Sequence, residues 1–399
     1  MNGAVGLLQG RRAVNLLIYS HAFAPQVGGV EMFTMSLARG LAESNPNEVF
    51  SRFAVTVVTQ TAATDASSDT LPFRVVRRPS AWDLWRLVGQ ADRVLLAGPA
   101  ILPLIFALLR RRKVVVTHHS YQSICPNGGL FHLPTQTSCP GHFRAGRYRQ
   151  CIDCMRIEET TIGSIRRLLL TFLRRGISHL ATHNVSVSEH VSRRTELKHG
   201  QVIRNGVAPR TALPAVARGK SGRVNFAYVG RLVSEKGVHV LVEAASLLKN
   251  RRTDFQVSII GDGPERARLD ALASSLDLKN HVFFFGFQLG ARLDDLIHDT
   301  SAVIMPSICE DAAPLSTLEQ MMQGRLMIAS ALGGLAEEVG HAGLTFAPGK
   351  PAELADQMQR VIEHPELVTD LGSKARDRAL NLYTVDRMLN EYRGLLLQQ

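Results

Sequence analysis

The sequence predicts an α/β protein with two domains, each built on a parallel sheet. Its 399 residues exceed what one ordinary hydrophobic core organises, which favours two domains of roughly 200 residues each. Short apolar runs of strand length alternate with stretches of helical spacing, and this alternation occurs twice along the chain. With 45% apolar and 20% charged residues, the composition is that of a globular protein and excludes a disordered or fibrous one.

The first half begins with an apolar run that follows Arg11-Arg12. This start resembles a signal peptide or a twin-arginine leader, but Asn15 interrupts it, so we interpret it as a first strand of a cytosolic protein. The apolar stretch from Val94 to Leu109 is shorter than the roughly 20 residues that span a bilayer, and we expect a strand, a turn and a helix there. The other elements expected in this half are strands at Val14–Ser20, Ala54–Thr59, Lys113–Thr117 and Val202–Arg204 and a helix at Val30–Leu41.

The second half repeats the pattern after residues 209–222, which lack periodicity and are rich in Ala, Pro, Gly and basic residues, as in a linker. The domains are therefore expected at residues 1–208 and 223–384, and a C-terminal helix at residues 385–399 is expected to pack back on the first domain. The elements expected in the second domain are strands at Val224–Val229, Val257–Ile260, Val282–Phe285 and Ala302–Met305 and helices at Gly237–Lys249, Arg266–Ser275 and Leu315–Gln323.

The excess positive charge lies in the first half of the chain. Residues 1–210 hold 26 Lys and Arg against 12 Asp and Glu, a balance of +14, whereas residues 211–399 hold 20 against 23, a balance of −3. Such asymmetry indicates an anionic partner or a basic, solvated face. Arg110–Lys113 and Ile165–Leu180 combine basic with apolar residues, a pattern that suits an anionic membrane surface, a lipid diphosphate acceptor or a core-packing helix. Because no aromatic surface is interleaved with the arginines, we expect no nucleic acid partner.

Parallel sheets bind ligands beyond the carboxyl ends of their strands, and polar residues gather at those positions. Arg231 and Lys236 follow a strand and lie beside a helix N-terminus, where both could neutralise a diphosphate or remain ordinary surface cations. Glu310 and Asp311 follow another strand, with Glu319 on the next helix, and carboxylates accept paired hydrogen bonds from vicinal diols.

These motifs resemble family 4 glycosyltransferases of the GT-B fold. The resemblance rests on Gly230–Gly237, Gly261–Pro264, Phe285-Gly286-Phe287 and the acidic stretch to Glu319, and it covers essentially the whole second domain. It implies two Rossmann-like domains facing across a cleft, with Arg231 and Lys236 on the diphosphate of a nucleotide sugar. It also implies Glu319 on the ribose and the base near Gly286 and Phe287. The further substrate-binding residues that we expect are Gly28, Gly29, Asn205 and Leu315.

Two positions depart from the family pattern. The family usually has two glutamates separated by seven residues, and counting back from Glu319 reaches Asp311 rather than Glu310, so either residue could contact the sugar. In many members a His precedes a Cys-Pro pair by six residues. That count selects His119 as the catalytic histidine and leaves His118 as a core residue, while the Asp that usually follows is Ser120.

We expect no cofactor to be required for catalysis. The sequence contains no Asp-x-Asp, the usual divalent metal motif of transferases, which agrees with Arg and Lys taking the role of the metal. A separate structural zinc could be held by Cys125, Cys139, Cys151 and Cys154, which fall within 30 residues and end in a Cys-x-x-Cys pair, although four unrelated buried thiols would give the same pattern. Cys309 lies apart and is expected in the core.

The sequence therefore favours a metal-independent, retaining glycosyltransferase that uses a UDP- or GDP-sugar. Its expected acceptor is a glycan or lipid-linked molecule in surface polysaccharide or lipopolysaccharide assembly, and its expected location is the cytoplasm, at the inner face of the membrane. The alternatives are a nucleotide-sugar epimerase or a phosphorylase of the same fold, or a catalytically silent nucleotide-sugar-binding scaffold. A scaffold would lose only binding on substitution of Lys236 or Glu319, whereas an enzyme would lose turnover.

Overall fold

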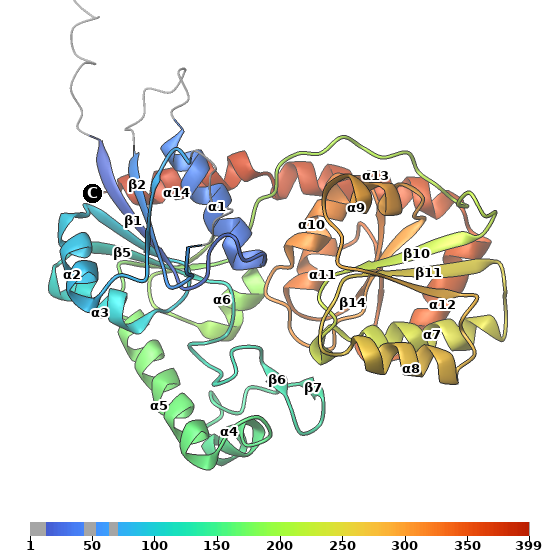
Figure 1. Cartoon of the computed structure of the whole chain (residues 1–399), viewed down its shortest axis with the longest axis horizontal. Coiled ribbons are helices and arrows are strands. Elements are labelled where there is room, and N and C mark those ends of the chain that lie inside the picture. The colour runs from blue at the N-terminus through green and yellow to red at the C-terminus, as the bar shows by residue number, and fades with distance from the viewer. Residues whose placement is uncertain (1–12, 44–52, 64–70, 399) are drawn as a thin grey trace, which may run out of the picture. The chain divides into compact units, whose positions relative to one another are not determined.

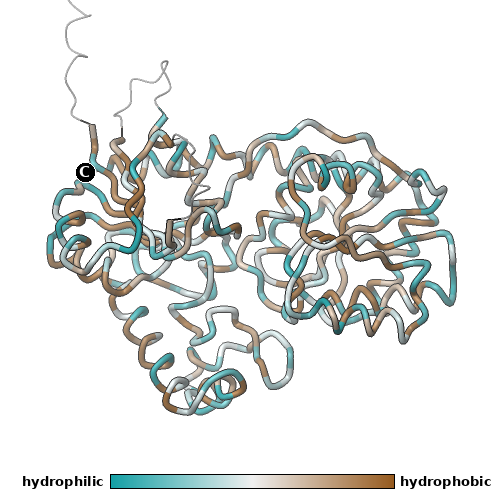
Figure 2. Tube along the Cα trace, viewed as in Figure 1, coloured by the Kyte–Doolittle hydropathy of each residue, from teal (hydrophilic) through white to brown (hydrophobic). Residues whose placement is uncertain are grey.

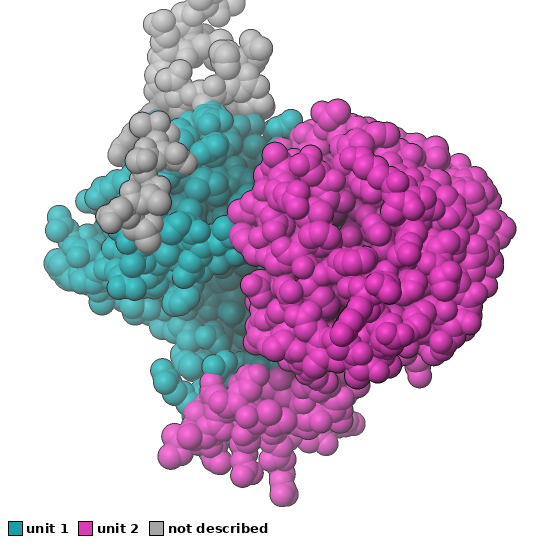
Figure 3. Space-filling view, turned by 45° about the vertical axis from the view of Figure 1, so that its right-hand side comes forward, with its two compact units in different colours: residues 1–128, 165–205, 385–399 teal, residues 129–164, 206–384 magenta. Residues whose placement is uncertain are grey.

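The computed structural model describes residues 13–43, 53–63 and 71–398 (Figure 1), so Arg11 and Arg12 lie outside the described residues. The chain divides into two compact units, coloured separately in Figure 3. Unit 1 contains residues 1–128, 165–205 and 385–399, and unit 2 contains residues 129–164 and 206–384. Each unit is built on its own parallel sheet, which confirms the predicted α/β class with two Rossmann-like domains.

The sheet of unit 1 has the strand order β3-β2-β1-β4-β5-β8-β9, and all its neighbouring pairs are parallel. The chain therefore builds one side of the sheet outward from β1 and then returns to build the other side from β4. The strands are β1 (Val14–Ser20), β2 (Phe53–Thr59), β3 (Arg74–Arg77), β4 (Arg93–Leu96), β5 (Lys113–His118), β8 (His183–Ser186) and β9 (Gly200–Val202).

Both faces of this sheet are buried, because successive side chains of a strand point to opposite faces. In β1, Leu16 and Ile18 belong to one apolar cluster, whereas Leu17 and Tyr19 belong to another on the opposite face. Figure 2 shows these strands as largely hydrophobic segments. The helices associated with this sheet are α1 (Gly29–Ala42), α2 (Ala81–Gln90), α3 (Ile101–Leu109), α5 (Thr161–Ser178), α6 (Glu189–Thr195) and α14 (Val385–Leu397).

The C-terminal helix α14 packs on unit 1, as the sequence predicted. Its apolar residues, Met388 and Leu389 among them, lie in the same cluster as Leu16 and Ile18 of β1. The hydroxyls of Tyr392 and Thr117 are 3.0 Å apart in the buried interior, which ties α14 to the end of β5. The chain thus leaves unit 1 for unit 2 and returns to complete the first core.

The sheet of unit 2 has the order β12-β11-β10-β13-β14-β15 and is also parallel throughout. Along β10, Phe226 and Tyr228 face one apolar cluster and Ala227 faces the other. The strands are β10 (Val224–Val229), β11 (Phe255–Ile260), β12 (Val282–Gly286), β13 (Ala302–Met305), β14 (Leu326–Ser330) and β15 (Leu344–Phe346). The helices are η1 (Ser234–Lys236), α7 (Val238–Lys249), α8 (Arg266–Ser275), α9 (Gly290–His298), α10 (Leu315–Met322), α11 (Gly333–Val339), α12 (Pro351–Glu363) and α13 (Glu366–Leu382).

Residues 129–164 group with unit 2, although the sequence-based boundaries place them in the first domain. Their regular structure consists of a hairpin of β6 (Phe131–His132) and β7 (Thr137–Ser138), the helix α4 (Tyr148–Met155) and the first four residues of α5. Phe131 is buried within the apolar cluster that contains Phe226 and Tyr228, and Leu133 packs against that cluster. The segment therefore contributes an aromatic side chain to the core of the C-terminal domain.

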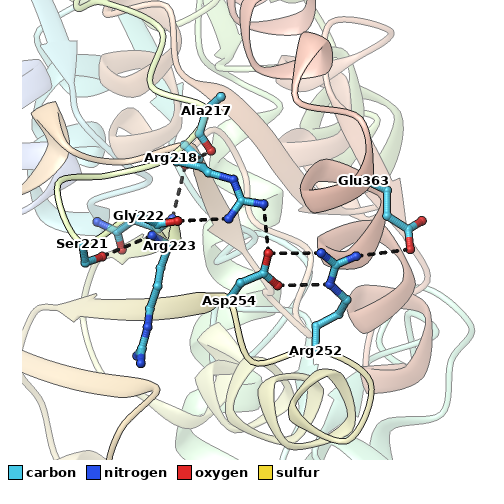
Figure 4. Close-up of polar contacts among 10 residues, drawn as sticks. Ala217, Arg218, Ser221, Gly222, Arg223, Arg252, Asp254 and Glu363 are labelled. Carbon is cyan, nitrogen blue, oxygen red and sulfur yellow. Dashed lines mark hydrogen bonds and ion pairs between the residues drawn. The ribbon is translucent and has the colours of Figure 1, made fainter.

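The predicted linker, residues 209–222, is held along unit 2 by hydrogen bonds. The Leu213 amide donates to the Gln323 carbonyl, and the Arg218 guanidinium donates to the Asp254 carboxylate at 2.9 Å. Arg252 also donates two hydrogen bonds to Asp254 and reaches toward Glu363, as Figure 4 shows. Hydrogen bonds from Arg252 and Arg218 lower the pKa of Asp254 to about 2, so this carboxylate is ionised at neutral pH.

Most predicted elements agree with the structure, and one strand is displaced. The predictions for β1, β10, β13 and α8 match residue for residue. The strand predicted at Val202–Arg204 is wrong in its bounds, because pairing of β9 with β8 ends at Val202. Within the described part of the chain, no helix is long and apolar enough to cross a membrane.

Glu338, on α11, is the most deeply buried acidic side chain named among the core residues of the described chain, at 2% exposure. Neither of its carboxylate oxygens has a hydrogen-bond partner among the described residues. Burial, reinforced by the nearby charge of Asp311, raises its pKa well above the usual range, so the side chain is protonated at pH values where an exposed glutamate is ionised.

We expect Glu338→Gln to raise the thermal unfolding midpoint at pH 8 and to leave it nearly unchanged at pH 4. Folding raises the pKa of Glu338, so above pH 4.5 the unfolded state binds fewer protons than the folded state. The free energy of unfolding of the wild type therefore falls as pH rises, by about 1.4 kcal/mol for each unit by which folding raises the pKa. Calorimetry between pH 4 and 8 measures this. Glu337→Gln, on the same helix but partly exposed, is the matched control, and an equal effect of both substitutions would contradict the assignment.

Candidate functional site

The candidate site lies at the carboxyl edge of the unit 2 sheet, between β10 and β13. The strand order reverses there, so the loops after these two strands lead away in opposite directions and leave a crevice between them. The loop after β10 contains η1 and ends at Gly237, and the loop after β13 runs from Pro306 to Pro314. All the predicted site residues of the second domain lie at this same edge.

Glycines allow the loops at this edge to pack backbone against backbone. Gly237 has φ +65°, and a Cβ there would lie 2.1 Å from the Pro306 carbonyl oxygen. A Cβ on Gly261, which has φ +148°, would lie 1.8 Å from the Gly230 carbonyl oxygen. No side chain fits at such distances, so both positions require glycine. The amide of Ile308 donates to the Glu235 carbonyl at 3.0 Å and links the loops after β10 and β13 directly.

Lys236 and Asp311 form an ion pair across the crevice. The Lys236 ammonium lies 2.5 Å from Asp311 Oδ1, and the two side chains are only 16% and 12% exposed. Burial alone would lower the pKa of Lys236, but the neighbouring Asp311 carboxylate outweighs it and the pKa is raised. The lysine therefore keeps its charge throughout the physiological pH range.

The Asp311 loop is held in place by α11. The Gly334 amide donates to the Asp311 carbonyl at 2.6 Å, and a Cβ on Gly334 would collide with the Ala312 carbonyl oxygen. Glu338 lies one helical turn after Gly334, on the same face of α11. Cys309 Sγ is 3.8 Å from Asp311 Oδ1, and burial together with this carboxylate raises the pKa of the thiol, which confirms Cys309 as a buried core residue.

Glu310 points to a different partner from that of Asp311. Its side chain is 8% exposed, and its Oε1 accepts a hydrogen bond of 2.9 Å from the hydroxyl of Ser138 at the end of β7. Sequence reasoning missed Ser138 because 172 positions separate the two residues and no local motif links them. The sequence left open whether Glu310 or Asp311 contacts the sugar, and the structure gives the two side chains different partners, Ser138 and Lys236.

Two further predicted site residues are Arg231, which precedes Lys236 in the chain, and Glu319, which follows Asp311. Arg231 is exposed, and its carbonyl accepts a hydrogen bond from the buried Tyr228 hydroxyl at 2.8 Å. Glu319 is partly buried on α10, and burial raises its pKa against the opposing effect of Arg210. The edge therefore presents cations and carboxylates within one set of loops.

The remaining predicted residues of this domain also follow strand ends. Gly286, the last residue of β12, has φ +69° and accepts a hydrogen bond from the Gly261 amide at 2.8 Å. Phe287, which follows it, is 59% exposed and presents an apolar ring to solvent. Leu315 begins α10 and packs against the apolar cluster beneath the site.

In unit 1, His119 directly follows β5. Its ring packs edge to face on Phe33 of α1 with centroids 4.3 Å apart, and its Nε2 has no hydrogen-bond partner within the described residues. Burial, with the neighbouring His118, lowers the pKa of His119 to about 3, so the imidazole is neutral. His118 is fully buried and its Nε2 lies 2.9 Å from Asn184 Oδ1, which confirms it as the core histidine.

Gly28 and Gly29 begin α1, as the sequence predicted for the first loop. Gly28 is the N-cap, and the Glu31 carboxylate folds back so closely that a Cβ on Gly28 would lie 2.5 Å from its Oε2. Asn205 is buried and is the last residue of the segment 165–205 of unit 1. Sequence reasoning missed a pocket of about 400 Å³ at the carboxyl ends of β1 and β2, which is lined by His21, Ala22, Pro25, Gln26, Gln60, Thr61, Ala62 and Arg78.

The four clustered cysteines are all buried, with Cys125 in unit 1 and Cys139, Cys151 and Cys154 in unit 2. Cys154 Sγ accepts a hydrogen bond from the Leu133 amide at 3.4 Å, and burial raises the pKa of its thiol. Among the residues that the structure describes, no three His, Cys, Asp or Glu side chains are grouped so that they could hold a metal ion. The structural zinc remains a prediction, for which metal analysis is the test.

Comparison with known proteins finds a family match in the second domain. Residues 211–378 match the family described as Glycosyl transferases group 1. The chain is 31% identical over 170 residues to an alpha-D-kanosaminyltransferase of Streptomyces kanamyceticus, covering 42% of this chain and 44% of that protein. It is 34% identical over 176 residues to the D-rhamnosyltransferase WbpZ of Pseudomonas aeruginosa, covering 42% of this chain and 43% of that protein. The chain thus spans less than half the length of these curated relatives.

Solved structures resemble the chain over almost its full length. The Anabaena protein HepE, crystallised with UDP-glucose, matches with a TM-score of 0.71 and 17% identity, covering 96% of this chain and 99% of that one. WaaG, a glycosyltransferase involved in lipopolysaccharide biosynthesis, matches with a TM-score of 0.68 and 16% identity, covering 96% of this chain and 100% of that one. Residues 211–378 therefore resemble the group 1 glycosyl transferases, and the two Rossmann-like domains have the GT-B fold of these solved structures.

Proposed function

We propose that this protein is a retaining glycosyltransferase that takes a sugar from UDP or GDP and needs no metal for the transfer. The observation that carries the proposal is the buried pair of Lys236 and Asp311 in the crevice between β10 and β13. A crevice of this kind is where nucleotides bind to doubly wound sheets. The match of residues 211–378 to group 1 glycosyl transferases supports the same ligand.

The donor diphosphate would be bound by Lys236 and Arg231. Lys236 is charged at every physiological pH, and Arg231 presents an exposed guanidinium from the same loop. Two fixed cations can stabilise the negative charge that develops on the leaving diphosphate, which is the largest single catalytic effect in many enzymes. The absence of an Asp-x-Asp motif from the sequence agrees with this role.

The other residues of the site would orient the nucleotide and its sugar. Glu319 would accept hydrogen bonds from the ribose, and the exposed ring of Phe287 beside Gly286 would lie against the base. We assign the sugar contact to Asp311 rather than Glu310. Asp311 has the family spacing from Glu319 and contacts Lys236, whereas Glu310 accepts a hydrogen bond from Ser138.

The transfer would be electrostatic, with the donor phosphate itself accepting the proton of the acceptor hydroxyl on the same face of the sugar. His119 suits a contact with the transferred sugar, because a neutral imidazole can exchange hydrogen bonds with hydroxyls without titrating near pH 7. The relatives include a rhamnosyltransferase and a lipopolysaccharide glycosyltransferase, which supports an acceptor in surface polysaccharide or lipopolysaccharide synthesis.

We expect a UDP- or GDP-sugar to raise the thermal unfolding midpoint of the wild type, because a ligand that binds only the folded state stabilises it. Lys236→Ala should abolish this shift. Lys249→Ala is the matched control, since Lys249 is also a lysine in an ion pair, with Asp277, but lies at the last residue of α7. No shift of the wild type with any nucleotide sugar would overturn the proposed function.

Asp311→Asn should lower kcat/KM for the donor by about 10²–10³-fold, the usual effect of losing one interaction with transition-state charge. Glu310→Gln and Ser138→Ala should each lower kcat/KM by less than about tenfold, because Glu310 accepts a hydrogen bond from Ser138 whereas Asp311 pairs with Lys236. Release of UDP or GDP from the nucleotide sugar measures all three. The reverse order of effects would assign the sugar contact to Glu310.

A further inference from the structure

Helix α5 (Thr161–Ser178) presents an apolar face to solvent. Its exposed large apolar residues are Ile162, Ile165, Leu169, Phe172 and Leu173, with exposures between 41% and 81%, and the exposed Leu180 follows shortly after the helix. Residues at these intervals of three, four and seven lie on one side of an α-helix. This set, with Leu180, is called the α5 apolar face below.

The opposite side of α5 is the buried one, and it is mostly polar. Ser164, Thr171 and Ser178 are fully buried, and only Leu168 adds a large apolar side chain to that side. The hydroxyls of Ser164 and Thr171 donate to carbonyls one turn back in the chain, which satisfies them without any partner from the core. The helix is thus oriented against the usual rule that the apolar side packs inward.

The charges of α5 are all positive. Its sequence from Thr161 to Ser178 contains Arg166, Arg167, Arg174 and Arg175 and no acidic residue. Arg166 and Arg167 are exposed, and Arg166 follows directly after Ile165 of the α5 apolar face. Arginines that flank an exposed apolar strip complement a lipid bilayer, whose interior is apolar and whose headgroups can be anionic.

We propose that the α5 apolar face docks this protein on an anionic membrane surface, with the helix lying in the plane of the bilayer. The apolar side chains would enter the boundary between headgroups and acyl chains, and the arginines would contact lipid phosphates. A symmetric contact with a second copy fits less well, because the face would then meet its own arginines. This inference goes beyond the proposed function, since docking requires neither donor nor turnover.

Co-flotation of the full chain with lipid vesicles tests the proposal. We expect the wild type to bind vesicles of phosphatidylcholine mixed with phosphatidylglycerol more strongly than vesicles of phosphatidylcholine alone. At high salt the two kinds of vesicle should bind equally. Leu169→Glu combined with Leu173→Glu should weaken binding to the anionic vesicles at least about tenfold. Arg166→Gln with Arg167→Gln should reduce the preference for phosphatidylglycerol.

Leu247→Glu combined with Leu380→Glu is the matched control, because both leucines are partly exposed on helices of unit 2. The control should bind vesicles as the wild type does, and all variants should keep the wild-type thermal midpoint. The proposal is overturned if the wild type ignores anionic vesicles or if the control loses as much binding as the α5 variant. It is also overturned if the wild type is a dimer in solution that the α5 variant makes monomeric without any vesicle binding.

Discussion

The ion pair between Lys236 and Asp311 joins the two loops that diverge at the reversal point of the second sheet. The ammonium and the carboxylate lie 2.5 Å apart and are largely out of water. Gly237 lets one loop touch the Pro306 carbonyl, and Gly334 lets α11 touch the other. An isolated buried charge is costly, so each partner depends on the other. The loops, the glycines and the pair therefore form one structural unit.

Burial concentrates acidic groups around this single lysine. Asp311 pairs with it directly, Glu338 lies behind on α11, and the Cys309 thiol is close to the same carboxylate. Not all of these groups can ionise together at short range in a medium of low dielectric, and the raised pKa values of Glu338 and Cys309 express this. Lys236 and Asp311 therefore face each other as a largely buried ion pair beside two acidic groups whose neutral forms are favoured.

Sequence reasoning predicted the parts of the fold where periodicity is strong. The strands of the sheet centres, such as β1, β10 and β13, are mostly apolar runs of strand length, and their bounds were predicted without error. The short edge strand β3 and the helices α11 to α13 were not predicted, because β3 is only four residues long and partly exposed and the helices lack a nearby motif. Candidate site residues that follow strands, such as Arg231 and Lys236, could be placed at one edge of the sheet because parallel strands bring their carboxyl ends together there. Contacts between distant segments, such as Ser138 with Glu310, leave no trace in local spacing.

The grouping of residues 129–164 with the C-terminal sheet has a consequence for how the protein can be divided. The chain passes between the two units at four points, after residues 128, 164, 205 and 384. A fragment that starts at the linker would resemble a whole domain in its sheet but would lack Phe131, leaving an unfilled space in its core. Removing a buried aromatic side chain costs about 3–5 kcal/mol. The second domain therefore cannot be cut out of the gene as one continuous segment. Its complete core needs residues 129–164, which are encoded between segments of the first domain.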